Sequence, residues 1–177
     1  LVAGALWSRG VRHLDAVIVS HADTDHYNGL PGLLERFSVG VVYVSPVMFR
    51  DATPPLRKLR QAIDEFGVPC RELHAGMRLG DDRSVRIEVL HPGARPTVGS
   101  DNSHSLVIEI EYAGRRLLLP GDLEMPGLDE LLAEEPRSYD VIMAPHHGSQ
   151  RSDPVGFAAW SMPLHVVISG AATHDTK

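Results

Sequence analysis

The sequence has little of what several classes of protein depend on. Its 177 residues include a single cysteine, Cys70, which excludes an internal disulfide and a zinc site built from several thiolates. No apolar run approaches the roughly 18 residues of a membrane-spanning helix, and no signal peptide opens the chain. Aromatic residues make up only 6% of it, and their spacing does not indicate a base-stacking platform. There is also no internal repeat, which excludes a solenoid.

Positive charge is scarce as well. There are 17 Lys and Arg against 23 Asp and Glu, a formal net charge of −6. This balance argues against a basic face for nonspecific binding of nucleic acid. It does not argue against an anionic substrate, because one or two bound divalent cations would add up to about four positive charges at a site.

What is present indicates one globular α/β domain over residues 1–177. The chain is 43% hydrophobic and 23% charged, and apolar runs alternate with helical or polar segments throughout. We expect strands at 16–20, 41–45, within 71–90, and at 106–112, 116–120, 141–144 and 165–169, and helices at 28–37, 55–66, 128–135 and 154–160. Ala113-Gly114 predicts a hairpin turn, Thr53 a helix cap, and Trp7, Tyr43 and Trp160 packing positions. Leu1 is not a natural start, so we expect a fragment of a longer protein.

The strongest chemical signal follows the first predicted strand. His21, Asp23, Asp25 and His26 place four potential metal ligands within six residues. Imidazole and carboxylate together suit Zn, Mn or Fe better than Ca or Mg. The alternative is a polar loop that caps the next helix, with Asp25 or Asn28 as the N-cap.

Two further clusters follow later strands and strengthen the metal hypothesis. Gly121-Asp122 ends an apolar run and could supply a bridging carboxylate, although Pro-Gly-Asp is also a common turn sequence. His146 and His147 precede a glycine, and two adjacent histidines are hard to explain as core residues because both need hydrogen-bond partners. The other histidines, 13, 74, 91, 165 and 174, occur singly and predict surface or satisfied positions.

The order of these motifs resembles the metallo-β-lactamase superfamily, and within it the ComEC-like competence DNA-uptake proteins. The resemblance runs from about residue 11 to 169 and rests on segments 14–21, 25–30, 102–107, 117–122 and 145–149. It implies an αββα sandwich, here truncated at both ends, because the family's opening hairpin and closing strand region lie outside the sequence. Such a truncation would expose a sheet edge.

The resemblance also implies a site with two divalent metal ions, zinc or manganese. His21 and Asp23 would hold one ion, Asp25, His26 and His147 the other, and Asp122 would bridge them. A water between the ions would be the nucleophile, with Asp25 orienting it and sharing its proton. His146 would face the substrate as a catalytic residue. Asn102, Ser105 and Ser149 would bind a phosphate oxygen; the alternative for Asn102 is a role as a weak metal ligand.

Two departures from the superfamily pattern bear on the metal. Asp23 stands where the superfamily more often has histidine, a replacement that ComEC-like members share. Asp101-Asn102 stands where a third histidine is expected, and His104 is displaced from that position. Fewer nitrogen ligands make manganese more plausible relative to zinc.

The resemblance implies a metal-dependent phosphodiesterase or nuclease that acts on DNA. It implies attachment to a membrane channel domain outside this chain, on the extracytoplasmic face of a bacterial membrane. Arginines at 50, 57, 60, 115, 116 and 151 would favour DNA if they lined one groove. The alternatives are a hydrolase of small esters or thioesters, which a deep apolar pocket would favour, and a degenerate domain that binds metal or a partner without turnover.

Overall fold

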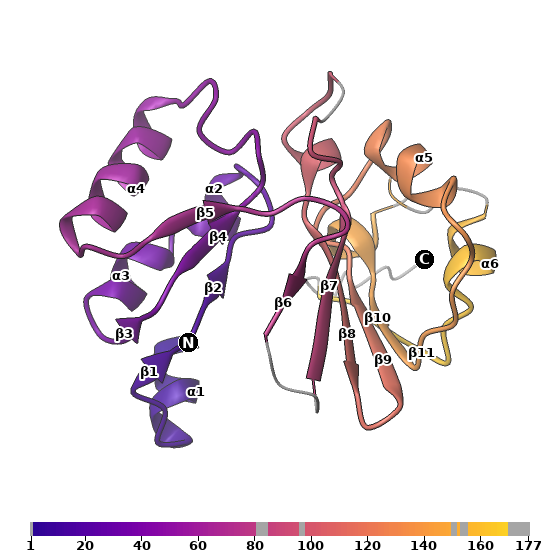
Figure 1. Ribbon diagram of the computed structural model, residues 1–177, viewed down its shortest axis with the longest axis horizontal. Helices are drawn as coiled ribbons and strands as arrows, with labels where there is room; N and C mark the ends of the chain where they lie inside the picture. Colours follow the sequence, from indigo (N-terminus) through magenta and orange to yellow (C-terminus); the bar gives the residue numbers. More distant parts are fainter. Residues whose placement is uncertain (1, 81–84, 96–97, 150–151, 153–155, 170–177) are drawn as a thin grey trace, which may run out of the picture.

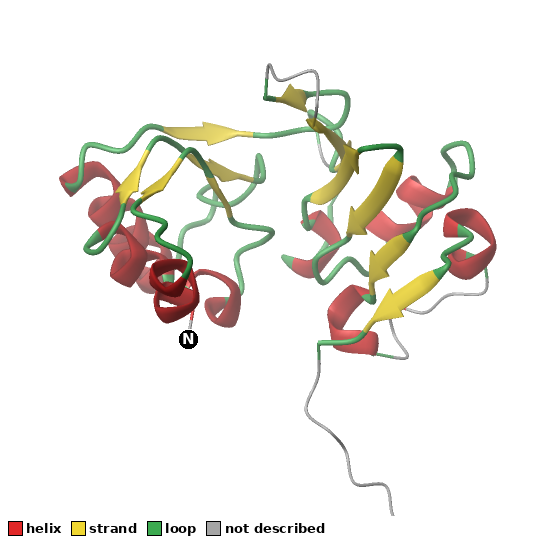
Figure 2. Ribbon diagram, turned by 90° about the horizontal axis from the view of Figure 1, so that it is seen from below, coloured by secondary structure: helices red, strands yellow, loops and turns green. Residues whose placement is uncertain are grey.

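The chain folds as two β-sheets that face each other, with helices on the outer side of each. Figure 1 shows this four-layer arrangement in a computed structural model, which describes residues 2–80, 85–95, 98–149, 152 and 156–169. The chain crosses from the first half to the second between β5 and β6 (Figure 2). The predicted αββα sandwich is therefore confirmed. In the described part of the chain, no helix has the length and apolar character needed to cross a bilayer.

The first half is a small parallel sheet covered by helices. Its elements are α1 (Val2–Ser8), β1 (His13–Leu14), β2 (Val17–Ile18), α2 (Thr24–Tyr27), α3 (Leu30–Leu34), β3 (Ser38–Val39), β4 (Val42–Val44), α4 (Pro54–Glu65) and β5 (Cys70–Glu72). Strands β2, β4 and β5 pair in parallel, and β1 pairs with β3. The buried side chains of α4, Leu56, Leu59 and Ile63, recur at helical spacing and pack on β4.

The end of α4 shows how local sequence sets an element boundary. Gly67 has φ +65°, and its N–H donates to the carbonyl of Asp64. The N–H of Val68 donates to the carbonyl of Ile63. These two bonds form a Schellman motif, in which glycine adopts the left-handed conformation without a Cβ penalty.

The second half is a six-stranded mixed sheet in the order β11-β10-β9-β8-β7-β6. Its elements are β6 (Arg78–Leu79), β7 (Val85–His91), η1 (Asn102–His104), β8 (Val107–Tyr112), β9 (Arg115–Leu119), α5 (Gly127–Leu132), β10 (Val141–Met143), η2 (Pro145–Gly148), α6 (Phe157–Ser161) and β11 (His165–Val167). Strands β6 to β9 are antiparallel, whereas β9, β10 and β11 are parallel. The hairpin turn has positive φ at Ala113 and Gly114, as the sequence predicted.

Each face of the larger sheet contributes to a separate apolar cluster. Helices α5 and α6 cover one face, where Leu118, Leu128, Tyr139 and Trp160 are buried. The other face turns toward β5, with Leu73, Val89, Leu106 and Ile108 buried. Alternation along β8 explains this division, because neighbouring residues of a strand point to opposite faces.

Strand direction brings the polar loops of the second half to one edge of the sheet. Because β9 and β10 are parallel neighbours, the loops after them, at Asp122 and His146, leave the same edge. Strand β8 is antiparallel to β9, so the segment before it also lies there. The N–H of Leu106 donates to the carbonyl of Ser20 over 2.8 Å, which ties this edge to the loop after β2.

Several sequence predictions about local structure were wrong. The helix expected at 28–37 is shorter, α3 alone, and its N-cap position is Gly29 rather than Asp25 or Asn28; the separate helix α2, with Asp23 at its N-cap position, was not predicted. The strand expected at 16–20 is shorter and not fully buried, because Ile18 is 36% exposed. Helix α1 was not predicted. By contrast, Thr53 is the N-cap residue of α4 as predicted, although its side chain makes no cap hydrogen bond, and Trp7, 52% exposed, packs at the edge by stacking on Phe37. Residues 154–155 of the helix expected at 154–160 lie outside the described residues.

Candidate metal centre

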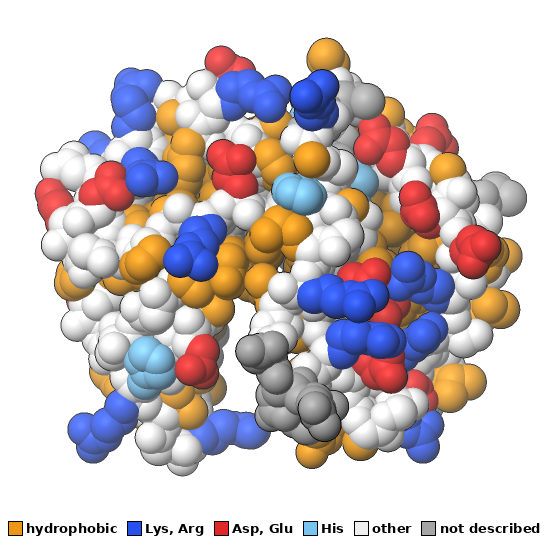
Figure 3. All heavy atoms as spheres, viewed as in Figure 1, with side chains coloured by type: hydrophobic (Ala, Val, Ile, Leu, Met, Phe, Trp, Pro, Cys, Tyr) orange, Lys and Arg blue, Asp and Glu red, His pale blue; other side chains and the backbone are white. Residues whose placement is uncertain are grey.

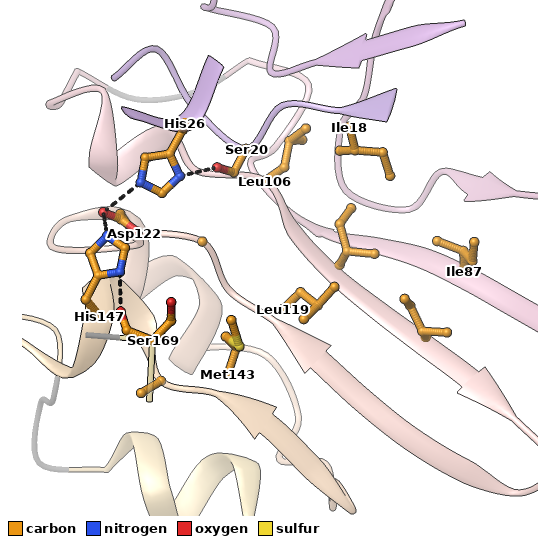
Figure 4. A pocket seen from close by; sticks show the side chains of 14 residues that line it. Ile18, Ser20, His26, Ile87, Leu106, Leu119, Asp122, Met143, His147 and Ser169 are labelled. Carbon is orange, nitrogen blue, oxygen red and sulfur yellow. Dashed lines mark hydrogen bonds and ion pairs between the residues drawn. The ribbon is translucent and has the colours of Figure 1, made fainter. Parts of the chain in front are cut away.

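Two segments of the chain bring histidine rings around one buried carboxylate, which lies on a third. Asp122, after β9, is 6% exposed. Its Oδ2 lies 3.3 Å from Nε2 of His26, 3.6 Å from Nε2 of His147 and 3.9 Å from Nε2 of His146. Figure 4 shows Asp122 between the rings of His26 and His147, which come from opposite halves of the molecule. A carboxylate among several imidazoles is a donor set that suits zinc or manganese.

The ligand atoms form two overlapping groups, each small enough to hold one ion. The first is His21, His26 and Asp122, and the second is Asp25, His26 and His147. Within each group, the ligand atoms all lie within 4.8 Å of one another. Asp23 adjoins the first group, with Oδ2 at 3.6 Å from Nε2 of His21. His26 belongs to both groups and Asp122 only to the first, so the division of ligands between two ions stays a prediction.

The far ring nitrogens of these histidines are held by oxygen atoms. Nδ1 of His147 lies 2.7 Å from the carbonyl of Ser169, which can only accept, so Nδ1 carries the hydrogen. The hydroxyl of Ser20 lies 3.0 Å from Nδ1 of His21 and 3.3 Å from Nδ1 of His26. Such contacts orient imidazole ligands and leave Nε2 for the metal.

The environment of His21 fits a metal ligand better than a core histidine. Its side chain is fully buried, yet Nε2 has no hydrogen-bond partner among the described residues. Burial, followed by the nearby His26, lowers the pKa of His21, so the neutral ring is favoured. A metal binds this neutral form and would satisfy the orphaned nitrogen, which otherwise costs about 1–3 kcal/mol. The residues present therefore fit the ions that the motifs imply.

Gly121 allows the loops to approach closely beside Asp122. Its φ is +58°, and a Cβ there would lie 3.1 Å from Cβ of Ser20 and 3.2 Å from Cβ of Ser105. A larger residue would meet both the steric penalty of positive φ and the crowding. The Gly-Asp pair is therefore more than a turn signal, because glycine lets Asp122 reach the histidines.

The histidine pair of η2 has an unusual backbone. His146 has φ +46° and ψ +51°, and His147 has φ +57° and ψ +21°. Two consecutive non-glycine residues in the left-handed region cost of order 1–3 kcal/mol each. With this backbone, His147 belongs to one ligand group, whereas His146 belongs to neither. The roles of ligand for His147 and substrate contact for His146 stay predictions.

The other predicted site residues differ in how directly they face this centre. The side chain of Asp25 is 71% exposed and lies 3.5 Å from Nε2 of His26. Ser105 is fully buried beside Gly121, and neither its Oγ nor Oδ1 of Asn102 has a hydrogen-bond partner in the described part. Ser149 lines a separate pocket between β10 and α6. His104 is buried in η1 and belongs to neither ligand group.

The single histidines are ordinary where the structure describes them. His91 is buried, and its Nδ1 lies 3.0 Å from the carbonyl of Ser105. His13 is exposed and contacts the hydroxyl of Ser38, and Nδ1 of His74 lies 3.0 Å from the carbonyl of Ala75. His165 lies on the exposed strand β11. His174 lies outside the described residues.

Sequence reasoning missed three groups that support the centre. The hydroxyl of Ser20 contacts two ligand histidines, the carbonyl of Ser169 holds His147, and the Glu124 carboxylate faces His146. The adjacency of Ser20 to His21 was a usable signal. The other two depend on strand pairing and loop geometry, which sequence spacing does not express.

An apolar cavity of about 410 Å³ opens beside the centre. One end is lined by His26, Asp122 and His147, and the remainder by apolar side chains such as Ile18, Ile87 and Met143 (Figure 4). It lies between the inner faces of the two sheets, where the space-filling view also shows hydrophobic side chains (Figure 3). The centre is therefore at one end of an apolar groove.

Comparison with known proteins agrees with this fold. The chain is 33% identical to ComE operon protein 3 of Bacillus subtilis over 93% of its length, and 25% identical to Competence protein ComA of Neisseria gonorrhoeae over 99%. It spans 21% and 23% of those proteins, about a fifth of their length. Zn(2+)-bound PqqB from Methylobacterium extorquens has a similar fold, with a TM-score of 0.50 and 16% identity over 73% of this chain and 44% of PqqB.

The family match covers most of the chain, including the loops that form the centre. The sequence model of the Metallo-beta-lactamase superfamily matches residues 3–158, which include every predicted ligand. The chain therefore belongs to the metallo-beta-lactamase superfamily, as a ComEC-like member.

Proposed function

We propose that this domain hydrolyses phosphodiester bonds in DNA, using two divalent ions held by the ligands around Asp122. Its family supports a hydrolase-fold role in competence. The observation that carries the proposal is the buried Nε2 of His21, which has no partner and lies in a ligand group with His26 and Asp122. A bound cation would be a ligand partner for this nitrogen and for the Asp122 carboxylate at the same time.

The predicted metal ligands have the following proposed roles. His21 and Asp23 would hold one ion, Asp25, His26 and His147 the other, and Asp122 would lie between. Ions held in this way supply Lewis acidity at the scissile ester and a more acidic water. The exposed carboxylate of Asp25 is placed to accept a proton at the open side of the centre. The predicted phosphate contacts of Ser105 and Ser149 have no such support, because Ser105 is fully buried and Ser149 lines a separate pocket.

Substrate attraction would come from the ions rather than from an arginine groove. Arg57 and Arg60 line a shallow groove on α4, whereas Arg115 and Arg116 lie on β9 and pair with Asp140 and Glu111. Basic and acidic side chains are intermixed over this part of the larger sheet (Figure 3). Arg151 lies outside the described residues. We therefore expect DNA binding to depend strongly on metal and only weakly on salt.

The test combines metal analysis with cleavage of single-stranded DNA. The metal-loaded protein should contain two equivalents of Mn or Zn and cleave DNA, and His21→Ala should lose both an ion and activity. His13→Ala, which changes an exposed histidine far from the ligand groups, is the matched control. Two bound ions with no cleavage of DNA or RNA would refute the nuclease and leave a degenerate, metal-binding domain.

The apolar cavity favours a second candidate, a hydrolase of small esters or thioesters. A ligand with an apolar group could occupy the cavity while its ester reaches Asp122. The same lining forms the inner faces of two sheets, which packing normally closes, so the cavity supports this candidate less directly than the ligands support metal. Turnover of a nitrophenyl ester without turnover of a nitrophenyl phosphodiester would favour it over the nuclease.

The relatives are much longer than this chain, and this bears on where in the cell the domain works. The chain spans about a fifth of them, so most of such a protein lies outside it. We propose that a membrane channel domain in the remainder places this domain on the extracytoplasmic face. Protease added to intact spheroplasts should then cleave the domain, and protection from protease would contradict that location.

A further inference from the structure

His91 is buried at the end of β7, outside both ligand groups of the proposed centre. Its Nδ1 lies 3.0 Å from the carbonyl oxygen of Ser105. We propose that His91 is a positioning residue, which through this hydrogen bond orients the peptide group that ties the loop of His21 to the larger sheet. The inference rests on the proposed function for its consequence in metal binding, but the bond and its effect on the loop can be tested without metal.

The peptide group between Ser105 and Leu106 carries two hydrogen bonds. Its carbonyl can only accept, so Nδ1 of His91 donates to it whether the ring is neutral or charged. Its N–H, which belongs to Leu106, donates to the carbonyl of Ser20 over 2.8 Å. A donor on the carbonyl polarises the amide and strengthens the bond that its N–H makes. The His91 ring therefore acts, through one peptide group, on Ser20 in the other half of the molecule.

Ser20 is the residue through which this effect reaches the centre. Its hydroxyl lies 3.0 Å from Nδ1 of His21 and 3.3 Å from Nδ1 of His26. A rotation of the 105–106 peptide would release Ser20 from the larger sheet, which carries Asp122 after β9. The two ligand histidines that Ser20 contacts would then lose their fixed position relative to that carboxylate.

An irregularity in β7 directs the His91 side chain. The pairing between β7 and β8 shifts between Val89 and His91, so that His91 lies opposite Val107. Val89 packs in the cluster that turns toward β5, whereas Val107 packs with α5 and α6 on the other face. Regular alternation would return His91 to the face of Val89, but the extra residue of the bulge places it on the face of Val107. The bulge therefore turns His91 toward α5.

Helix α5 confines the ring from the other side. A Cβ on Gly127 would lie 2.9 Å from Cε1 and 3.0 Å from Nε2 of His91, so glycine leaves the space that the ring fills. Nε2 also lies 3.4 Å from Oε2 of Glu130, which is partly exposed. The ion pair with Glu130 is the alternative reason for a histidine at this position. The two nitrogens thus have different partners, and this difference allows the two roles to be separated.

The test compares His91→Asn with His91→Gln in the metal-free chain. The amide nitrogen of asparagine is as many bonds from Cα as Nδ1, so it can still donate to Ser105, whereas that of glutamine matches Nε2, which faces Glu130. The readout is hydrogen exchange at the amide of Leu106, compared with the bonded amide of Leu73 in the first half. We expect exchange at Leu106 to be about 10- to 100-fold faster in His91→Gln, the factor that a lost buried hydrogen bond gives, and close to wild type in His91→Asn.

Two results would overturn the inference. Equal acceleration at Leu106 and Leu73 in His91→Gln would show a loss of global stability alone, and equally fast exchange at Leu106 in both variants would exclude the Nδ1 bond. Glu130→Gln is the matched control and should leave exchange at Leu106 unchanged; acceleration there would assign the effect to the ion pair. If neither His91 variant folds, the wild type decides. Nitrogen–proton spectra should show a slowly exchanging hydrogen on Nδ1 of His91, and its absence would refute the bond.

Zinc binding tests the consequence for the centre. We expect His91→Gln to weaken zinc affinity about 10-fold in titration calorimetry and His91→Asn to retain it, because groups that orient ligand histidines have effects of this size or larger. Unchanged zinc affinity in His91→Gln, together with faster exchange at Leu106, would confine the effect to the loop and overturn the positioning role. If the wild type binds no zinc, the proposed function fails, and the exchange measurement still decides whether His91 orients the peptide group.

Discussion

Replacing His21 with alanine should separate metal binding from structural stability. In the metal-free protein two effects oppose each other. Losing a fully buried imidazole costs about 2–4 kcal/mol of packing, but removing the orphaned Nε2 relieves about 1–3 kcal/mol. The net effect should lie between a gain of about 1 kcal/mol and a loss of about 3 kcal/mol. Since a chain of this size loses about 2–4 °C in Tm per kcal/mol, we expect a decrease of at most about 12 °C.

The response to metal should differ much more. At a free metal concentration of 100 times Kd, binding stabilises the wild type by about 2.7 kcal/mol, or roughly 5–11 °C. If losing the His21 ligand raises Kd about 100-fold, the same concentration stabilises the variant by only about 0.4 kcal/mol. That is a shift of under about 2 °C.

Calorimetric melting with and without zinc or manganese measures both effects. His13→Ala, an exposed histidine, should keep the wild-type shift. A His21→Ala protein that keeps the full metal-induced shift would refute the assignment of His21 as a ligand. A large metal-free loss together with a retained shift would mark His21 as a packing residue.

Three other predictions address the hydroxyl beside two ligand histidines, a buried ion pair and a buried histidine. Ser20→Ala removes the hydroxyl that contacts Nδ1 of both His21 and His26, and it should weaken metal affinity about 10- to 100-fold in titration calorimetry. Unchanged metal affinity would contradict a role for this shared contact. Arg137→Met leaves the buried Glu109 with only the Tyr139 hydroxyl as a partner among the described residues, and it should cost about 2–3 kcal/mol in urea unfolding. Arg115→Met, at an exposed pair, is the control and should leave the urea midpoint nearly unchanged; equal shifts in the two variants would contradict the importance of burial. Burial lowers the pKa of His91, so below about pH 6.5 the unfolded chain binds more protons than the folded chain. The free energy of unfolding of the metal-free protein should therefore fall from pH 7 to pH 5, and it should fall less in His91→Gln. An equal decrease of this free energy with pH in both proteins would exclude His91 as a cause.

Periodic elements were the most predictable part of the fold. Helix α4 carries Leu56, Leu59 and Ile63 on one face and ends at a left-handed glycine, so both its face and its end follow from local sequence. The hairpin between β8 and β9 was predictable for the same reason. Short elements were not: α1, α2 and α3 have four to seven residues, too few for a repeating pattern to set their bounds.

The ligands were recognisable because their chemistry is unusual in sequence. Four donors within six residues after an apolar run, then Gly-Asp and His-His-Gly after later runs, are hard to reconcile with a core or a plain turn. Motif order extended this to the family, which the family match confirmed. The division of the ligands between two ions remains a prediction.

The sequence by itself determined the donor types, their order and the alternation of strands and helices, because these depend on residue identity and local periodicity. Only the tertiary structure decided which atoms meet. The parallel pairing of β9 and β10 places Asp122 beside the η2 histidines, and the backbone bond between Ser20 and Leu106 brings His21 and His26 across from the other sheet. Contacts such as Glu124 with His146 depend on distances between loops far apart in the chain. Strand register and loop conformation set those distances, and no local pattern encodes them.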